Sequence, residues 1–104
     1  MARKFSHPSA KDLTMDGILY ALSDPIRRSI VAKLMTCDEM SCTKSCAEGM
    51  SPSTISFHHK TLRENGLIRS EKKGVSVINT IRKDEIDKKF PGLLDSILKY
   101  HKAD

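Results

Sequence analysis

Along most of the chain, apolar residues recur at the three- and four-residue spacing of helices that bury one face. The first such run predicts a helix over residues 10–22, with apolar positions at Met15, Ile18, Leu19 and Leu22. Asp24 followed by Pro25 predicts the start of a second helix, because aspartate caps free N–H groups and proline suits the first turn. The buried face of that helix is predicted at Ile26, Ile30, Val31 and Leu34.

A polar helix with few apolar positions is predicted over residues 51–65. Ser51 and Pro52 are start signals, and Gly66 suits the left-handed conformation that ends a helix. A short helix near residues 42–48 and a turn over residues 49–51 are predicted before it. A short helix, a tight turn with glycine and a second helix form the pattern of a helix-turn-helix.

After Gly66 the spacing changes to alternation, which is typical of strands. Residues 67–71 and 75–81 predict an antiparallel hairpin whose tip contains Lys72 and Lys73. A basic hairpin directly after a helix-turn-helix makes a winged helix. The predicted fold is therefore mainly α with a small β-hairpin, made of about five helices and a two-stranded wing.

Helical spacing resumes at the end of the chain, with a helix to about residue 89 and another over residues 91–101. The last helix has a broad apolar face at Leu93, Leu94, Ile97 and Leu98. A small domain has little core left for such a face, so a second copy of the chain is expected to cover it. The alternative is that it covers the helix over residues 10–22 of its own chain.

The length of 104 residues predicts one domain over residues 10–104, preceded by a flexible basic arm over residues 1–9. Eighteen lysines and arginines against 13 acids give a net charge of +5, which favours a polyanionic partner. No apolar run has the length of a membrane span or of a signal peptide's apolar region. Three cysteines, an odd number, favour a reducing cytoplasm, and the absence of catalytic motifs argues against an enzyme.

Three segments add a more specific signal: ALSDPIRRSI at residues 21–30, SPSTISFH at 51–58 and LRENGLI at 62–68. In this order and spacing they resemble the signature helix, the recognition helix and its exit in winged-helix repressors of the ArsR type. The resemblance covers residues 13–81, and FPGLL at 90–94 looks like a tail of some members. It implies a homodimer, joined by its first and last helices, that binds an imperfect inverted repeat in double-stranded DNA until an effector releases it.

The resemblance also implies which residues contact DNA and which contact the second copy. The DNA-binding positions carried over are Ser51, Ser53, Thr54, Ser56, Phe57 and His58, with Lys60 and Arg63 nearby. The wing adds Lys72 and Lys73, which are expected to neutralise phosphates. The dimer interface is expected at Ile18, Leu19, Leu93, Leu94, Ile97 and Leu98.

Two residues of the recognition helix depart from the pattern of the family. Phe57 stands where a polar or basic residue is usual, and either contact with a thymine methyl or a place in the core would account for it. His59 stands where a leucine or phenylalanine usually packs inward, and we expect a half-buried, hydrogen-bonded histidine there.

Many ArsR-type proteins sense metals or metalloids through two cysteines in a C-x-C pattern. Here Cys42 lies near the second of these positions, but Met40 replaces the first. Cys42 and Cys46 are one helical turn apart, and Cys37 precedes them. Three readings stay open: a site for arsenite or another thiophilic ion, a redox disulfide, or small buried residues without a signalling role. No other metal site is predicted, and no cofactor is required.

The sequence thus predicts a cytoplasmic, homodimeric transcriptional repressor that binds specific DNA. The alternative is a winged-helix adaptor or anti-repressor that binds another protein and does not recognise DNA sequence. Salt dependence distinguishes the two, because a DNA binder that uses lysines and arginines loses affinity steeply as salt rises.

Overall fold

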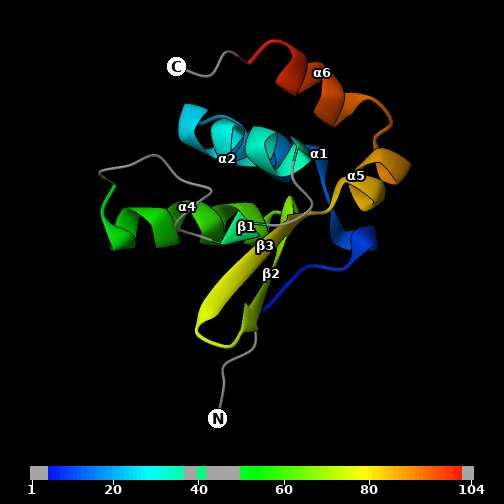
Figure 1. The fold of residues 1–104 in the computed structure, drawn as a ribbon. Helices are drawn as coiled ribbons and strands as arrows, with labels where there is room; N and C mark the ends of the chain where they lie inside the picture. Colours follow the sequence, from blue (N-terminus) through cyan, green and yellow to red (C-terminus); the bar gives the residue numbers. More distant parts are fainter. Residues whose placement is uncertain (1–4, 37–39, 42–49, 102–104) are drawn as a thin grey trace.

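The computed structural model describes residues 5–36, 40–41 and 50–101, and within them it contains five α-helices, a 3₁₀-helix and three strands (Figure 1). In chain order the elements are η1 (Ala10–Asp12), α1 (Met15–Ala21), α2 (Pro25–Thr36), β1 (Met40–Ser41), α4 (Pro52–Glu64), β2 (Ile68–Lys73), β3 (Ser76–Ile81), α5 (Lys83–Lys89) and α6 (Leu93–Lys99). The hairpin of β2 and β3 follows α4 directly and extends away from the helices. The predicted mainly α winged fold is confirmed.

The first predicted helix is broken at Leu13 and Thr14. Thr14 is extended, and its hydroxyl accepts a hydrogen bond from the N–H of Gly17 at 3.0 Å, so it starts α1 anew. The side chain of Leu13, between η1 and α1, is buried in the core, so the backbone approaches the core at this residue. The apolar spacing over residues 15–22 was therefore correct for α1, while the expectation of one continuous helix from residue 10 was wrong.

The predicted start of α2 is confirmed by its hydrogen bonds. A carboxylate oxygen of Asp24 accepts from the N–H of Ile26 at 2.8 Å and from that of Arg27 at 3.2 Å. These contacts satisfy donors that have no partner inside the helix. Ile30, Val31 and Leu34 are buried as predicted, and Ile26 packs at the edge of the core.

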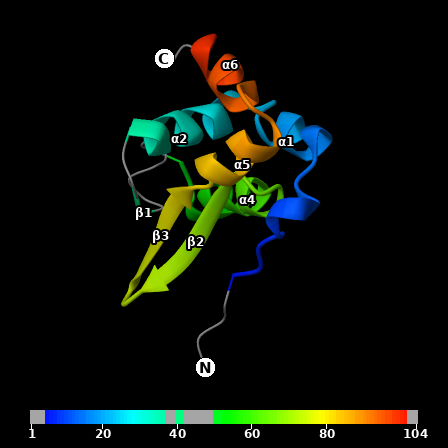
Figure 2. The ribbon, with the colours of Figure 1, turned by 90° about the vertical axis from the view of Figure 1, so that its right-hand side faces the viewer.

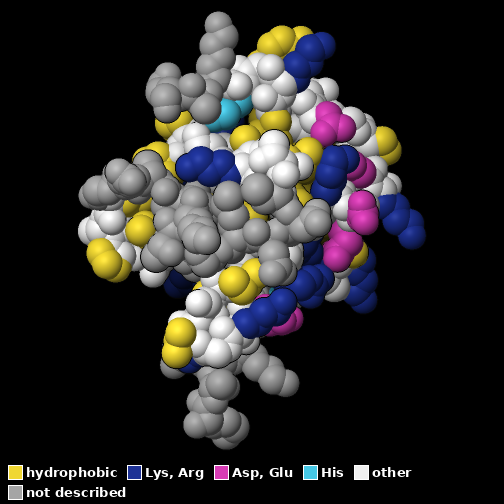
Figure 3. Space-filling model, in the orientation of Figure 1, with side chains coloured by type: hydrophobic (Ala, Val, Ile, Leu, Met, Phe, Trp, Pro, Cys, Tyr) yellow, Lys and Arg dark blue, Asp and Glu magenta, His cyan; other side chains and the backbone are white. Residues whose placement is uncertain are grey.

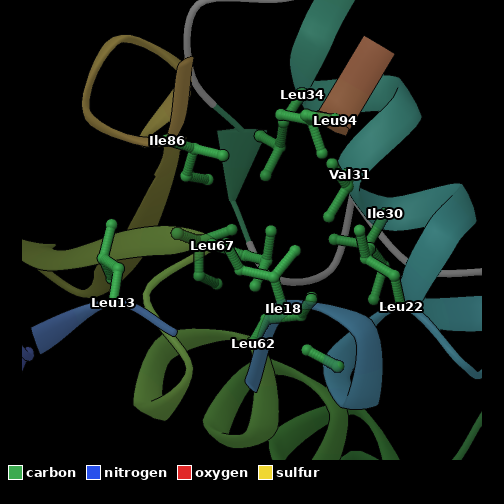
Figure 4. Packing of buried hydrophobic residues seen from close by; sticks show 12 residues of the cluster. Leu13, Ile18, Leu22, Ile30, Val31, Leu34, Leu62, Leu67, Ile86 and Leu94 are labelled. Carbon is green, nitrogen blue, oxygen red and sulfur yellow. The ribbon is translucent and has the colours of Figure 1, made fainter. Parts of the chain in front are cut away.

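One apolar core lies where the helices meet the base of the hairpin (Figure 4). Its members are Leu13, Ile18, Ala21, Leu22, Ile30, Val31, Leu34, Leu62, Leu67, Ile68, Ile86 and Leu94. From α4 only Leu62 belongs to this cluster, and Ile55 packs at its border. The polar helix is thus attached along a narrow apolar stripe, which leaves its other side chains available for polar contacts or solvent.

The sheet is antiparallel with the order β1-β3-β2, so β3 is the central strand. The pairing of Lys73 with Ser76 leaves Gly74 and Val75 as a two-residue turn, with Gly74 at a φ of +62°. Glycine tolerates this conformation, which hairpin turns of this length require. Lys72 and Lys73 therefore belong to the end of β2, rather than to the loop itself.

Strand β1 was not predicted. Its two residues, Met40 and Ser41, pair with Asn79 and Ile78 of β3 and extend the two-stranded wing to a three-stranded sheet. Two residues are too few to show alternation, so no local pattern marks them as a strand. The predicted short helix at 42–48 lies outside the described residues.

The end of the chain returns to α2. After α6, the imidazole Nδ1 of His101 accepts a hydrogen bond from Nε of Arg28 at 3.2 Å, and its Nε2 lies 3.1 Å from the hydroxyl of Ser29. Leu94 of α6 is fully buried. The last helix therefore packs on its own chain, while it is shorter at both ends than the predicted 91–101.

Gly66 ends α4 in the left-handed conformation, with a φ of +80°. Its N–H donates to the carbonyl of Arg63 at 3.1 Å, and the N–H of Leu67 donates to that of Leu62 at 2.9 Å. These two bonds satisfy carbonyls at the helix end. A Cβ at this position would collide with the Cδ2 atom of the buried Leu13.

We predict that Gly66→Ala lowers the free energy of unfolding by about 2–4 kcal/mol, since it combines a strained backbone with overpacking against Leu13. Urea denaturation followed by circular dichroism measures this loss. Gly74→Ala is the matched control, because Gly74 also has a positive φ but a Cβ there meets nothing within 4 Å. An equal loss in both variants would contradict the steric part of the argument.

Candidate nucleic-acid interface

The outward face of α4 carries four of the ten predicted DNA-binding residues. Ser53, Ser56, Phe57 and Lys60 are exposed and lie three or four residues apart, which places them along one side of the helix. We call these four residues the outward stripe. They present two hydroxyls, one aromatic ring and one cation. The size and polarity of the stripe suit the major groove of DNA, which admits an α-helix.

Ser51 and Thr54 stand at the start of α4, at the edge of the outward stripe. The hydroxyl oxygen of Ser51 accepts from the N–H of Thr54 at 3.3 Å and lies 2.9 Å from the hydroxyl of Thr54. The predicted cap is confirmed. Both hydroxyls are exposed, so they remain accessible from outside while they organise the first turn.

His58 is not on the outward face, which corrects its predicted role as a direct DNA contact. It is only 6% exposed, and its Nδ1 accepts a hydrogen bond from Nη1 of Arg27 at 3.3 Å. Arg27 is also buried, and its Nε donates to the carbonyl of Ala21 at 2.7 Å. His58 therefore fastens α4 to the junction between α1 and α2.

Phe57 projects outward and is 55% exposed, so the alternative of a place in the core is wrong. Its ring contacts the ring of His58 edge-on, with 5.7 Å between the centroids and 60° between the planes. Arg27 is hydrogen-bonded to the ring of His58. The edge of the Phe57 ring that contacts His58 therefore packs on a residue that is itself held in place. The rest of the phenyl ring is accessible to solvent.

His59 is fully buried rather than half-buried, and the expected hydrogen bond is present. Its Nδ1 donates to the carbonyl of Ile55 at 2.8 Å. Burial lowers the pKa of His59 below its ordinary value, the positive charge of Arg63 lowers it further, and the hydrogen bond to the carbonyl of Ile55 partly opposes both effects. The neutral imidazole is therefore the form that the folded protein favours.

Arg63 connects α4 to the hairpin instead of pointing freely at a partner. Its Nη1 donates to the hydroxyl of Ser70 at 3.2 Å, and that hydroxyl donates to the side-chain oxygen of Asn79 at 2.7 Å. Its guanidinium also lies 4.4 Å from the ring centroid of Phe5. Arg63 thus links α4 to β2 and contributes to the angle between the helix and the wing.

Two residues of the predicted arm, which is the dark blue segment of Figure 2, contact the rest of the protein: Phe5 lies against Arg63 of α4, and His7 is hydrogen-bonded to Ser70 of β2. The Nε2 atom of His7 accepts a hydrogen bond from the backbone N–H of Ser70 at 2.9 Å. Burial lowers the pKa of His7, and the nearby charges of Arg69, Arg82 and Arg63 lower it further. The neutral ring that these conditions favour is the form that can accept this bond. The basic residues of the predicted arm, Arg3 and Lys4, lie outside the described residues.

The wing presents its cations at its far end, as predicted. Lys72 and Lys73 are exposed, and Lys73 Nζ lies 3.9 Å from a carboxylate oxygen of Glu71. Val75 at the tip is 100% exposed. Figure 3 shows lysine and arginine side chains over the hairpin, whereas on the side of α5 several acidic side chains lie among the cations. The hairpin side is therefore the better match for a polyanion.

Of the residues predicted at the dimer interface, Ile18 and Leu94 have no exposed surface in the single chain. They form its core and cannot contact a second copy, so this part of the prediction is corrected. Leu19 is exposed, and the partly buried Leu93, Ile97 and Leu98 border the core. Met15 and Tyr20 of α1 are also large and exposed, and Met15 lies one turn before Leu19.

The cysteine prediction cannot be placed, because Cys37, Cys42 and Cys46 lie outside the described residues. Among the residues that are described, no three His, Cys, Asp or Glu side chains are grouped closely enough to hold a metal ion. No helix in the described part of the chain is long and apolar enough to cross a membrane.

Known proteins resemble the chain in sequence and in structure. The family model described as bacterial regulatory protein, arsR family, matches residues 17–70. The uncharacterized HTH-type transcriptional regulator YceK of Bacillus subtilis (strain 168) is 33% identical over 82 residues, which cover 77% of this chain and 82% of that protein. The crystal structure of the ArsR family transcriptional regulator RHA00566 matches 86% of this chain and 98% of its own with a TM-score of 0.66, at 23% identity.

The buried His59 leads to a prediction about pH. Its pKa is lowered from 6.5 in the folded state, so the unfolded state binds more protons just below neutral pH, and stability is lost as the pH falls below 6.5. His59→Leu removes this titration and is expected to reduce the fall in the free energy of unfolding between pH 7.5 and 5. Urea denaturation at each pH measures the change.

His7 contributes to the pH dependence in the same direction, so His7→Asn is the variant for comparison. The two substitutions should each remove a separate part of the pH dependence. If His59→Leu kept the full pH dependence of the original protein, the buried imidazole would not be its source.

Proposed function

Because the chain belongs to the ArsR family of bacterial regulatory proteins, we propose that it is a homodimeric repressor that binds an imperfect inverted repeat in double-stranded DNA. Membership of this family makes it a DNA-binding transcriptional regulator rather than an enzyme. The observation that best supports the finer proposal is the outward stripe of α4, which stands beside a hairpin with exposed lysines.

In this proposal α4 enters the major groove with its outward stripe facing the bases. Hydroxyls of Ser53 and Ser56 are suited to hydrogen bonds with base edges. Lys60 of α4 and Lys72 and Lys73 of the wing reach the phosphates on either side of the groove. Arg63 and His58 contribute indirectly, because they hold α4 at its angle to the wing and to α2.

A second copy of the chain would cover the exposed apolar side chains of α1. Met15 and Leu19 are one turn apart and Tyr20 is beside them, and all three are large and about half exposed. Leu93, Ile97 and Leu98 of α6 are partly exposed and would extend the contact. Such a dimer is expected to place its two α4 helices about one helical turn of DNA apart, roughly 34 Å.

A cytoplasmic location fits a regulator of DNA and the odd number of cysteines. The signal that releases the proposed repressor is assigned to thiol chemistry at Cys37, Cys42 and Cys46, through a metalloid such as arsenite or through oxidation. Support for this part comes from the residue types and their spacing alone.

The test of the proposed function is selection from a randomised library of duplexes, which should yield an inverted repeat. We predict that Lys72→Ala then weakens binding to all sequences about equally and reduces the dependence of affinity on salt. Ser53→Ala should instead change the preferred sequence, with a loss of about 1–3 kcal/mol for the base it contacts. Both residues are exposed, so neither change is expected to disturb folding.

Each variant serves as the control for the other in this experiment. An unchanged sequence preference in Ser53→Ala would show that α4 does not read the bases as proposed. Binding that neither selects a sequence nor weakens with salt would replace the repressor with the adaptor alternative.

The thiol signal is tested with the reduced dimer bound to its selected duplex. We predict that arsenite or peroxide releases the DNA, and that Cys42→Ser resists whichever agent acts. Fluorescence anisotropy of the labelled duplex measures the release. Release by neither agent, or equal release in Cys42→Ser, would exclude Cys42 as the sensing residue and leave the DNA-binding proposal intact.

A further inference from the structure

We propose that Phe57 is a specificity-determining residue, which recognises the 5-methyl group of a thymine in the major groove. The inference rests on the proposed function, because it assumes that the outward stripe of α4 faces DNA. It goes further by naming the chemical group that is read and the residue that reads it.

The position of Phe57 is the first argument. The ring is 55% exposed between Ser53, Ser56 and Lys60, so any duplex that contacts these residues also contacts the ring. A phenyl ring offers no strong hydrogen bond to a base edge, and its favourable contact is with an apolar group that leaves water at the same time. Thymine is the base that presents such a group, its 5-methyl, in the major groove.

The ring is also held in place before any partner binds. Its neighbour His58 is buried and contacts it edge-on, with 5.7 Å between the centroids. Arg27 donates to Nδ1 of His58, and Arg27 is held in turn by its hydrogen bond to the carbonyl of Ala21. A supported side chain loses less conformational freedom on binding than a mobile one, which favours a small contact such as a single methyl.

The rest of α4 provides few other means of reading a base. Side chains that grip a purine with two hydrogen bonds are arginine, lysine, asparagine and glutamine. Arg63 donates to Ser70, and the Nδ2 atom of Asn65 donates to the carbonyl of Thr61 at 2.9 Å, so both are engaged within the protein. Lys60 is the remaining residue of this kind on the outward stripe. Hydroxyl groups and one aromatic ring therefore carry much of the direct readout, and the ring makes the apolar part of it.

The experiment uses the inverted repeat selected by the full-length dimer, with deoxyuridine in place of one symmetric pair of thymines at a time. Uracil keeps every hydrogen-bonding group of thymine and lacks only the methyl. The wild-type protein should lose about fourfold in affinity per contacted methyl, hence about sixteenfold for one symmetric pair, and little at the others. Fluorescence anisotropy at constant salt measures each dissociation constant.

The variants identify the residue that senses the methyl. Phe57→Ser should bind the thymine and uracil duplexes equally, while Phe57→Leu should retain part of the difference. Val75→Ser is the matched control, because it removes an exposed apolar side chain at the wing tip and should retain the full difference. Circular dichroism verifies that each variant is folded.

Two results would overturn the inference and leave the proposed function standing. One is an inverted repeat in which no thymine can be distinguished from uracil. The other is a difference between the duplexes that persists in Phe57→Ser, since another residue would then read the methyl. Failure to select any sequence would refute the proposed function itself, and the inference with it.

Discussion

The orientation of α4 depends on buried hydrogen bonds, since its apolar contribution to the core is a single leucine with one isoleucine at the border. Arg27 and His58 connect its middle to the α1–α2 junction, and Arg63, Ser70 and Asn79 connect its end to the hairpin. Apolar packing is not directional, but hydrogen bonds are, so these two links determine how the helix is turned. A recognition helix needs a fixed rotation about its own axis, because the same outward side chains must face the partner each time it binds.

The same links explain why the outward stripe carries so little charge. Arg63 of α4 and the buried Arg27 of α2 are hydrogen-bonded within the protein, and a buried polar group without a partner would be costly. Lys60 and Lys72 are exposed cations on the helix and the wing that can face a polyanion. Flexible lysines suit phosphates, which form a nearly uniform charge, whereas the more rigid arginines suit the internal contacts that require fixed geometry.

The parts of the fold that the sequence predicted well are those with local signals. Ser51, Pro52 and Gly66 mark the ends of α4 by cap and turn chemistry, and alternation marks the hairpin. The break at Thr14 was missed although threonine is a common cap: the four apolar positions of the predicted helix all lie after Thr14, so they carry no information on residues 10–14. Strand β1 was missed because pairing with a distant strand, and not its own two residues, makes it a strand.

The candidate site was predicted less completely, and the errors have one physical origin. The family pattern identifies which positions of the helix matter, but His58, Arg27 and His7 take their roles from partners far away in the chain. The pair Arg27–His58 is 31 residues apart, and His7 and Ser70 are 63 apart. Periodicity describes neighbours within a few turns, so it indicates exposure for a basic residue and cannot find its distant partner. Phe57 is the opposite case, because it is an apolar residue that the fold leaves exposed.

The sequence left Phe57 open between a contact with DNA and a place in the core, and the folded chain shows that this side of α4 faces outward. The network that begins at Ala21 and passes through Arg27 and His58 ends at this ring, so the helix is attached and its exposed aromatic is supported by the same contacts. Loosening that attachment would therefore disturb the angle of α4 and the position of its most distinctive outward side chain together. The end of α1 is therefore connected, through Ala21, Arg27 and His58, to the surface proposed to read DNA. The exposed apolar side chains of α1 and that surface lie on different elements, but these contacts join the elements.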